Sequence, residues 1–252
     1  MSKDLALILS IVFIALGAIC VTLFVIGKVK KYSVKETIVK SIASLFFIAV
    51  AAVNLRYQDL NILPLFVVLG LICGLCGDIW LELKIIYTEQ DTEFTYAGFL
   101  SFAIGHVFYI TGMYLEFFHE GDNVLFIILP LVVGLAAGFG NLFLSKLMKQ
   151  DFGKYKAICV LYGSLLFSFL LVNISLNILH GFQVTTLIIL LVGSILFVLS
   201  DLILSGTYFG EGKERPIDLI SNSITYYAAQ YVIAFSLFFL IYHCSCHIHI
   251  PP

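Results

Sequence analysis

The sequence carries very little charge. Only 12% of its 252 residues are Asp, Glu, Lys or Arg, whereas a soluble globular domain carries about 25%. Hydrophobic residues make up 61% of the chain, and the mean hydropathy is +1.05. This composition excludes an ordinary soluble domain and indicates an integral membrane protein.

Long blocks of charge of one sign are also missing. The net charge is −2, and no basic run offers a surface for nucleic acid, so we expect no nucleic-acid partner. No long polar insert divides the chain. We therefore expect one transmembrane domain over residues 1–243, followed by a short tail over residues 244–252.

Cysteines are few and suggest no disulfide framework. Cys20, Cys73, Cys76 and Cys159 all lie within apolar runs, where we expect small buried hydrophobes. Cys73 and Cys76 form a C-x-x-C motif, but no second ligand pair accompanies it. The end of the chain reads HCSCHIHIPP over residues 243–252. Its Cys and His residues could bind a soft metal, and a frayed chain end is the simpler interpretation.

Apolar runs long enough to cross a bilayer recur along the chain. The hydrocarbon core requires about 20 apolar residues per helix. The runs of this length are Leu5–Gly27, Thr37–Leu55, Ile62–Leu83, Phe94–Phe118, Val124–Leu147, Ala157–Leu179, Val184–Ser205 and Asp218–Tyr242. Because the connections are short, neighbours should pack antiparallel, and the predicted fold is an all-α bundle of eight transmembrane helices.

Lysine and arginine gather at one end of this predicted bundle. Twelve of the 14 lie there: Lys28, Lys30, Lys31, Lys35, Lys40, Lys84, Lys146, Lys149, Lys154, Lys156, Lys213 and Arg215. Only Lys3 and Arg56 lie at the other end. Since these residues concentrate in cytoplasmic loops, we expect both chain ends outside the cytoplasm. The protein would be a multi-pass protein of the cell membrane, or of the endoplasmic reticulum in a eukaryote.

Two aspartates interrupt the apolar runs. GLICGLCGDIWLEL carries Asp78, and GSILFVLSDLILSG carries Asp201. An ionised Asp facing lipid costs several kcal/mol, so such acids face the bundle interior and mark functional sites. Both spans run in the same direction, which places the two acids at similar depth, roughly 8 Å inside the cytoplasmic end at 1.5 Å per residue. Glu82, at the end of its span, is expected to reach interfacial water.

Other polar side chains fall in the same half of the predicted bundle. Asn222, Tyr226 and Gln230 recur every four residues and so share one helix face. The remaining candidates for binding substrate or water are His106, Tyr109, Asn141 and Tyr227. The outer halves of the helices are almost wholly apolar. We therefore expect an intramembrane cavity that opens to the cytoplasm and not a pore through the membrane.

Paired acids allow more than one interpretation. Zinc could use Asp78, Asp201 and a histidine, but only His106 lies in the same half, so we expect no metal and no other cofactor. A proton-coupled transporter could also use paired acids and should show internal symmetry, of which the chain gives little sign. A lipid-binding bundle without catalysis is a third alternative.

Four short motifs together resemble the YhhN-like family of lysoplasmalogenases. They are CGDIWLEL, FAIGHVFYITG, GSILFVLSDLILSG and ITYYAAQYVIA, and they follow one another in the family's order and spacing. The resemblance implies a hydrolase acting on ether bonds. Such an enzyme cleaves the sn-1 vinyl-ether bond of a lysoplasmalogen and releases a fatty aldehyde and glycerophospho-ethanolamine or -choline. Its partners are then a lysophospholipid in the membrane and water.

The resemblance also implies roles for single residues. The family's glycine–aspartate and serine–aspartate pairs match Asp78 and Asp201, which are then catalytic. The family's histidine after a glycine matches His106. Its tyrosine–glutamine group matches Tyr226, Tyr227 and Gln230.

The chemistry of a vinyl ether suits two carboxyl groups. Hydrolysis begins with slow proton transfer to the β-carbon and gives an oxocarbenium ion that water captures. Two carboxyl groups in a dry cavity supply a donor and an anion, as in the glycosidases. Either aspartate could be the donor. We take Asp201 as donor and Asp78 as its ionised partner, with His106, Tyr226 and Gln230 bonding water or the ether oxygen.

Overall fold

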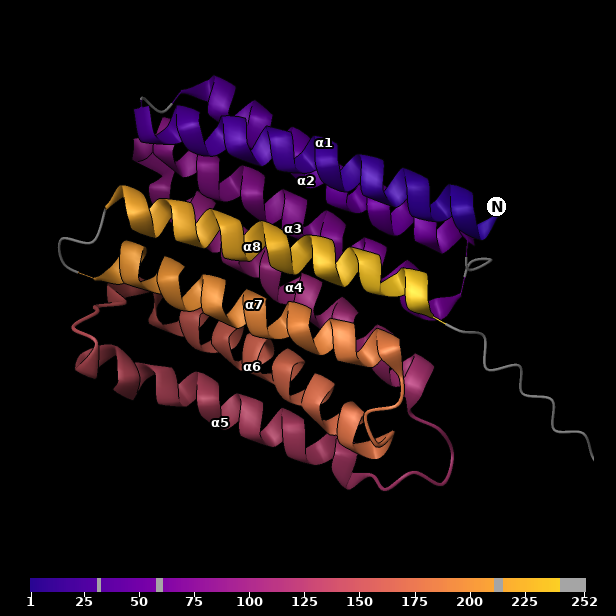
Figure 1. Ribbon diagram of the computed structural model, residues 1–252. Helices are drawn as coiled ribbons and strands as arrows, with labels where there is room; N and C mark the ends of the chain where they lie inside the picture. Colours follow the sequence, from indigo (N-terminus) through magenta and orange to yellow (C-terminus); the bar gives the residue numbers. More distant parts are fainter. Residues whose placement is uncertain (31–32, 58–60, 211–214, 241–252) are drawn as a thin grey trace, which may run out of the picture.

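The computed structural model describes residues 1–30, 33–57, 61–210 and 215–240 (Figure 1). In these residues the regular structure is helical, as the sequence predicts. The α-helices are α1 (Lys3–Lys30), α2 (Val34–Tyr57), α3 (Ile62–Ile86), α4 (Asp91–Phe117), α5 (Leu125–Leu147), α6 (Lys156–Leu179), α7 (Thr185–Phe209) and α8 (Pro216–Ser236). Short 3-10 helices cover Thr88–Gln90, Gly153–Tyr155 and Leu237–Phe239.

The helices lie side by side with their long axes close to parallel, α1 at one edge and α5 at the other (Figure 1). Consecutive helices form the pairs α1–α2, α3–α4, α5–α6 and α7–α8, each with an extensive interface. Further contacts join α2 to α3 and α8, and α4 to α6. The expected antiparallel bundle is confirmed. We call its lysine-rich end the end at which α1, α3, α5 and α7 finish and the other four helices begin.

By length and composition, seven helical segments in the described part of the chain could cross a membrane. They comprise α1 to α7. The expected eighth span, Asp218–Tyr242, is helical as far as Phe239, and its last two residues lie outside the described residues; α8 is not among the seven. Its polar residues, among them Asn222, Tyr226 and Gln230, make it less apolar than α7, with which it pairs. It nevertheless packs within the bundle, against α7, α2 and α1.

Glycines bring α3 and α4 close together. A Cβ atom added at Gly70 would lie 2.2 Å from the Tyr109 ring, and one at Gly77 would lie 2.6 Å from the Phe102 ring. On α4, a Cβ at Gly105 would lie 3.0 Å from the Gly70 carbonyl oxygen. These glycines therefore leave room for aromatic side chains between the two helices.

Two glycines of α5 form its interface with α6. A Cβ atom at Gly134 would lie 2.7 Å from the Cα of Ser168, and one at Gly138 would lie 2.8 Å from the Cα of Ser164. The remaining surface of α5 exposes large apolar side chains, including Phe143. Such a surface suits a peripheral helix in contact with lipid.

The cysteines are only partly as expected. All four that the structure describes are free thiols, and Cys159 is buried while Cys20 and Cys73 are half-buried. Cys76 is exposed, so its predicted burial is wrong. It lies on the outer face of α3, one turn from the exposed Trp80. The Cys and His residues predicted for the tail, 243–252, lie outside the described residues.

Candidate active site

A cavity of about 370 Å³ lies at the lysine-rich end of the bundle, within the range of about 300–1,000 Å³ typical of small-molecule sites. Residues of α1 to α4 and α6 to α8 line it. Asp78 of α3 and Asp201 of α7 both line this cavity. The other polar residues of its wall are Lys28, Lys40, Glu82, Tyr162, Ser200, Thr207, Tyr208, Arg215, Asn222, Ser223, Tyr226 and Tyr227.

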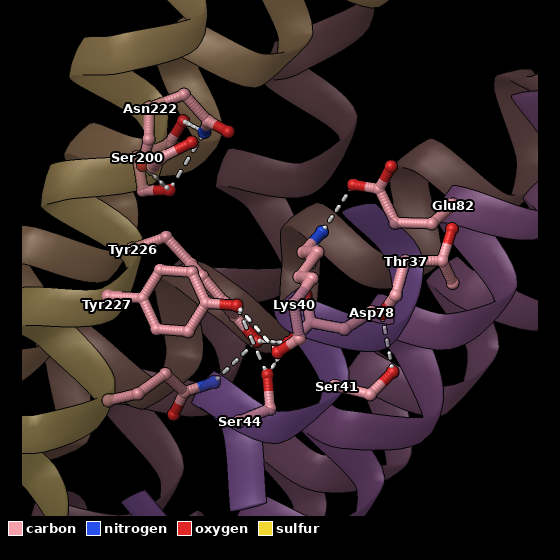
Figure 2. A network of polar contacts seen from close by, with 12 residues as sticks. Thr37, Lys40, Ser41, Ser44, Asp78, Glu82, Ser200, Asn222, Tyr226 and Tyr227 are labelled. Atoms are coloured by element: carbon pink, nitrogen blue, oxygen red, sulfur yellow. Dashed lines mark hydrogen bonds and ion pairs between the residues drawn. The ribbon is translucent and has the colours of Figure 1, made fainter. Parts of the chain in front are cut away.

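Asp78 is buried and has three partners from two other helices (Figure 2). The Lys40 ammonium nitrogen of α2 lies 3.1 Å from Asp78 Oδ1. Ser44 Oγ and Tyr226 Oη donate hydrogen bonds to Asp78 Oδ2, at 2.7 and 2.9 Å. A positive charge and two hydroxyl donors therefore stabilise a carboxylate at this position.

Glu82 is buried with an exposed fraction of 2%, so the expectation that it reaches interfacial water is wrong. Its Oε1 atom lies 2.8 Å from Lys28 Nζ and 2.8 Å from Lys40 Nζ. The two lysines come from α1 and α2, and Figure 2 shows the Lys40 side chain pointing to Glu82. Pairing with two ammonium groups offsets the cost of burying the carboxylate.

Asp201 has a different environment. Tyr162 Oη of α6 donates a hydrogen bond to Asp201 Oδ2. Within the described residues, no lysine, arginine or histidine forms an ion pair with Asp201. Ser200 precedes Asp201 on α7 and bonds to Asn222 of α8. Asn222 Nδ2 donates to the Ser200 carbonyl oxygen at 2.8 Å and to Ser200 Oγ at 3.0 Å, and these hydrogen bonds join α7 to α8 (Figure 2).

The predicted polar face of α8 lies in the bundle interior and continues the hydrogen bonds of Asp78. Gln230 Nε2 donates to Tyr226 Oη at 3.1 Å. Tyr109 Oη of α4 donates to Gln230 Oε1 at 3.2 Å. Tyr227 Oη donates to the Lys40 carbonyl oxygen at 3.2 Å. The structure thus joins these side chains to Asp78, although Tyr109 and Gln230 do not line the cavity themselves.

His106 lies behind the cavity wall and is fully buried. Its Nδ1 atom is 2.8 Å from the Phe102 carbonyl oxygen of the same helix. Its Nε2 atom has no hydrogen-bond partner among the described residues. Aromatic rings surround the imidazole: Tyr109, Tyr162, Phe169 and Phe197.

Asn141 lines a second, smaller cavity of about 60 Å³ between α4, α5, α6 and α7. It does not line the large cavity. Asp201 and Tyr162 line both. The seventh helix therefore presents its aspartate to two separate spaces.

Sequence reasoning missed four residues of the site: Lys28, Lys40, Ser44 and Tyr162. A signal existed for one pair, because Lys40 and Ser44 are four residues apart and share a face of α2. In the sequence, Lys40 instead counts among the lysines at the cytoplasmic end that indicate the orientation. Tyr162 gave no signal, since a tyrosine in an apolar helix is common.

The zinc alternative requires a cluster of ligands. Among the described residues, no group of three or more His, Cys, Asp or Glu side chains could hold a metal ion. His106, the candidate third ligand, is enclosed by aromatic rings and does not line the cavity that Asp78 and Asp201 share.

A model of the YhhN family matches residues 35–237 of the chain. The match begins in the first turn of α2 and ends one residue beyond α8, so it covers every helix that lines the large cavity except α1. The resemblance inferred from the four motifs is confirmed. No curated protein and no solved structure matches the chain.

Proposed function

Because the chain belongs to the YhhN family, we propose that it is a membrane-embedded hydrolase of ether bonds, a lysoplasmalogenase. Its substrate is a lysoplasmenyl-ethanolamine or -choline, and its products are a fatty aldehyde and a glycerophospho-alcohol. The observation that carries this proposal is the shared cavity, in which one aspartate is ion-paired with a lysine and the other is bonded to a phenol.

The two environments suit the two roles that the reaction needs. Asp78 has an ammonium group and two hydroxyl donors around it, which favour the charged carboxylate. Asp201 has a hydroxyl donor and no cationic partner among the described residues. Without a cation beside it, Asp201 is the carboxyl group favoured to hold a proton, so Asp201 is the general acid.

Proton transfer is the first step. The π electrons of the vinyl-ether double bond form a new C–H bond at the β-carbon with the proton of Asp201, which becomes a carboxylate. The positive charge is then shared between the α-carbon and the ether oxygen. The Asp78 carboxylate, held towards the cavity by Lys40, Ser44 and Tyr226, stabilises this oxocarbenium ion.

Water capture and collapse complete the reaction. The oxygen of water bonds to the α-carbon and loses a proton to a carboxylate, which gives a hemiacetal. The bond between the α-carbon and the glycerol oxygen then breaks. Its electron pair leaves with the glycerol oxygen, which takes up a proton, and the hemiacetal hydroxyl loses its proton as the aldehyde forms.

The proposed orientation places the lysine-rich end and the cavity at the cytoplasmic side, with both chain ends outside the cytoplasm. In that arrangement the cavity lies just below the membrane surface. The vinyl-ether carbons of a lysolipid lie just beneath its glycerol, at a comparable depth. The substrate can therefore enter with its headgroup near Lys28 and Arg215, which also line the cavity.

Turnover by the purified protein tests this proposal. Detergent-solubilised protein incubated with a lysoplasmenyl-ethanolamine should release the fatty aldehyde, detected by mass spectrometry. Asp78→Asn and Asp201→Asn should each lower kcat by about 10²–10⁴-fold, whereas Asp4→Asn, in the exposed first turn of α1, should not. Absence of aldehyde from the wild-type protein would leave a transporter or a non-catalytic lipid-binding protein as the interpretation.

A further inference from the structure

The small cavity beside Asp201 has a use in the proposed reaction. Its volume is about 60 Å³, and it lies between α4, α5, α6 and α7. Asp201, Tyr162 and Tyr208 line this cavity as well as the large one. A molecule in the small cavity can therefore reach Asp201 while a lysolipid occupies the large cavity.

The wall of the small cavity offers several groups that bind water. Asn141 and Ser205 line it together with the two tyrosines and Asp201. Ser205 Oγ donates to Gln150 Oε1 at 2.9 Å. The amide of Asn141 makes no hydrogen bond with any described residue, although it has two donors and an acceptor.

The size of the small cavity favours water over a lipid chain. A single water molecule needs about 10–15 Å³ of cavity volume and two to four polar partners. The space of about 60 Å³ thus holds a few water molecules. It is far below the roughly 300 Å³ at which pockets begin to hold drug-sized organic ligands.

We propose that the small cavity supplies the water that captures the oxocarbenium ion, and that Asn141 positions this water beside Asp201. The proposal rests on the proposed lysoplasmalogenase function. After Asp201 has given its proton to the β-carbon, its carboxylate faces the stored water. The water oxygen bonds to the α-carbon, one of its O–H bonds breaks, and the proton passes to Asp201, which regains its starting form. One residue thus acts first as acid and then as base, as in retaining glycosidases.

Hydrolysis in D₂O tests this inference. In the wild-type protein, capture follows protonation directly, so unreacted substrate should carry no deuterium at the vinyl β-carbon. In Asn141→Leu, the oxocarbenium ion waits for water and can return a proton to Asp201. We expect kcat to fall about 100-fold and the recovered substrate to contain deuterium at the β-carbon, measured by mass spectrometry and NMR.

A pair of glycine variants provides a matched control. A Cβ atom at Gly163 would lie 2.7 Å from Asn141 Nδ2, so Gly163→Ala displaces the amide without adding a group to the large cavity. A Cβ atom at Gly140 would have no atom within 4 Å. We expect Gly163→Ala to show the same exchange as Asn141→Leu, to a smaller extent, and Gly140→Ala to match the wild type. Thermal unfolding of each variant verifies that it is folded. If Asn141→Leu does not fold, the comparison of Gly163→Ala with Gly140→Ala still tests the inference.

The other outcomes overturn the inference. Wild-type kcat in both Asn141→Leu and Gly163→Ala would show that water comes from elsewhere. Slower turnover without deuterium in the recovered substrate would place Asn141 in the proton-transfer step. A raised KM for long-chain substrates alone would place the alkyl chain in the small cavity. If the wild-type protein releases no aldehyde, the proposed function fails and this inference fails with it, whereas the preceding outcomes leave the proposed function intact.

Discussion

The ammonium nitrogen of Lys40 lies 3.1 Å from Asp78 Oδ1, across the interface between α2 and α3. The same nitrogen lies 2.8 Å from Glu82 Oε1, one turn further along α3. Lys40 thus bridges two buried carboxylates, and its side chain is only 13% exposed. Because buried charges are costly unless they are paired, each of these three side chains depends on the others.

Replacing Lys40 by methionine should lower kcat about 100-fold, because Asp78 loses its charge partner and its fixed position. Lys40→Arg keeps the positive charge and should retain more activity. The pH–rate profile should change in Lys40→Met and stay close to the wild type in Lys40→Arg. Steady-state kinetics with a lysoplasmalogen give both quantities, and an unchanged kcat and profile in Lys40→Met would show that Lys40 is only structural.

Glu82→Gln should destabilise the protein by about 3–5 kcal/mol, since Lys28 and Lys40 then lose the carboxylate they share in a buried position. Asp218→Asn is the control, because Asp218 pairs with an exposed Arg215, and it should cause no measurable change. Thermal unfolding in detergent compares the two. Equal shifts would mean that the buried cluster contributes no more than a surface pair.

Gly138→Ala should destabilise the protein by about 1–3 kcal/mol. The added Cβ would lie 2.7 Å from the Ser164 nitrogen of α6, and a backbone atom cannot move aside as a flexible side chain can. Gly140→Ala, two residues further along α5, meets open space and should be neutral or slightly stabilising. Thermal unfolding of both variants tests whether close backbone contact holds α5 to α6.

Tyr162→Phe removes the hydroxyl that donates to Asp201. We expect kcat to fall about 10-fold, in line with the loss of one hydrogen bond to the carboxylate that Asp201 becomes when it gives up its proton. The effect should vanish in the background of Asp201→Asn, because the two residues act together. A double-mutant cycle on kcat measures this coupling. Additive losses would mean that Tyr162 acts on another part of the site.

A lysolipid with a saturated alkyl ether at sn-1 should bind but release no aldehyde. Its headgroup and chain are those of the substrate, but it has no double bond that Asp201 can protonate. It should therefore inhibit competitively, with an inhibition constant close to the KM of the vinyl ether. Inhibition kinetics with the matched alkyl and vinyl compounds test this, and release of aldehyde or alcohol from the alkyl ether would contradict the proposed chemistry.

Much of the architecture follows from the sequence alone. Apolar runs of about 20 residues must form helices in a membrane, because the backbone finds no other hydrogen-bond partners there. The two aspartates stand out for the same reason, since charge in such runs is costly. The i, i+4 spacing of Asn222, Tyr226 and Gln230 placed them on one face of α8, and the structure confirms that Tyr226 and Gln230 are bonded to each other.

Only the tertiary structure decided which helix meets which. Lys40 is 42 residues from Glu82, and Lys28 is 54 residues from it, so no local pattern links them. Lipid and the protein interior are both apolar, and the helices therefore lack the strong one-sided pattern that would reveal how each is rotated. For this reason the sequence predicted Glu82 in water and gave no sign of Tyr162. The packing of α2 and α8 against α3, and of α6 beside α7, determined the partners of both aspartates.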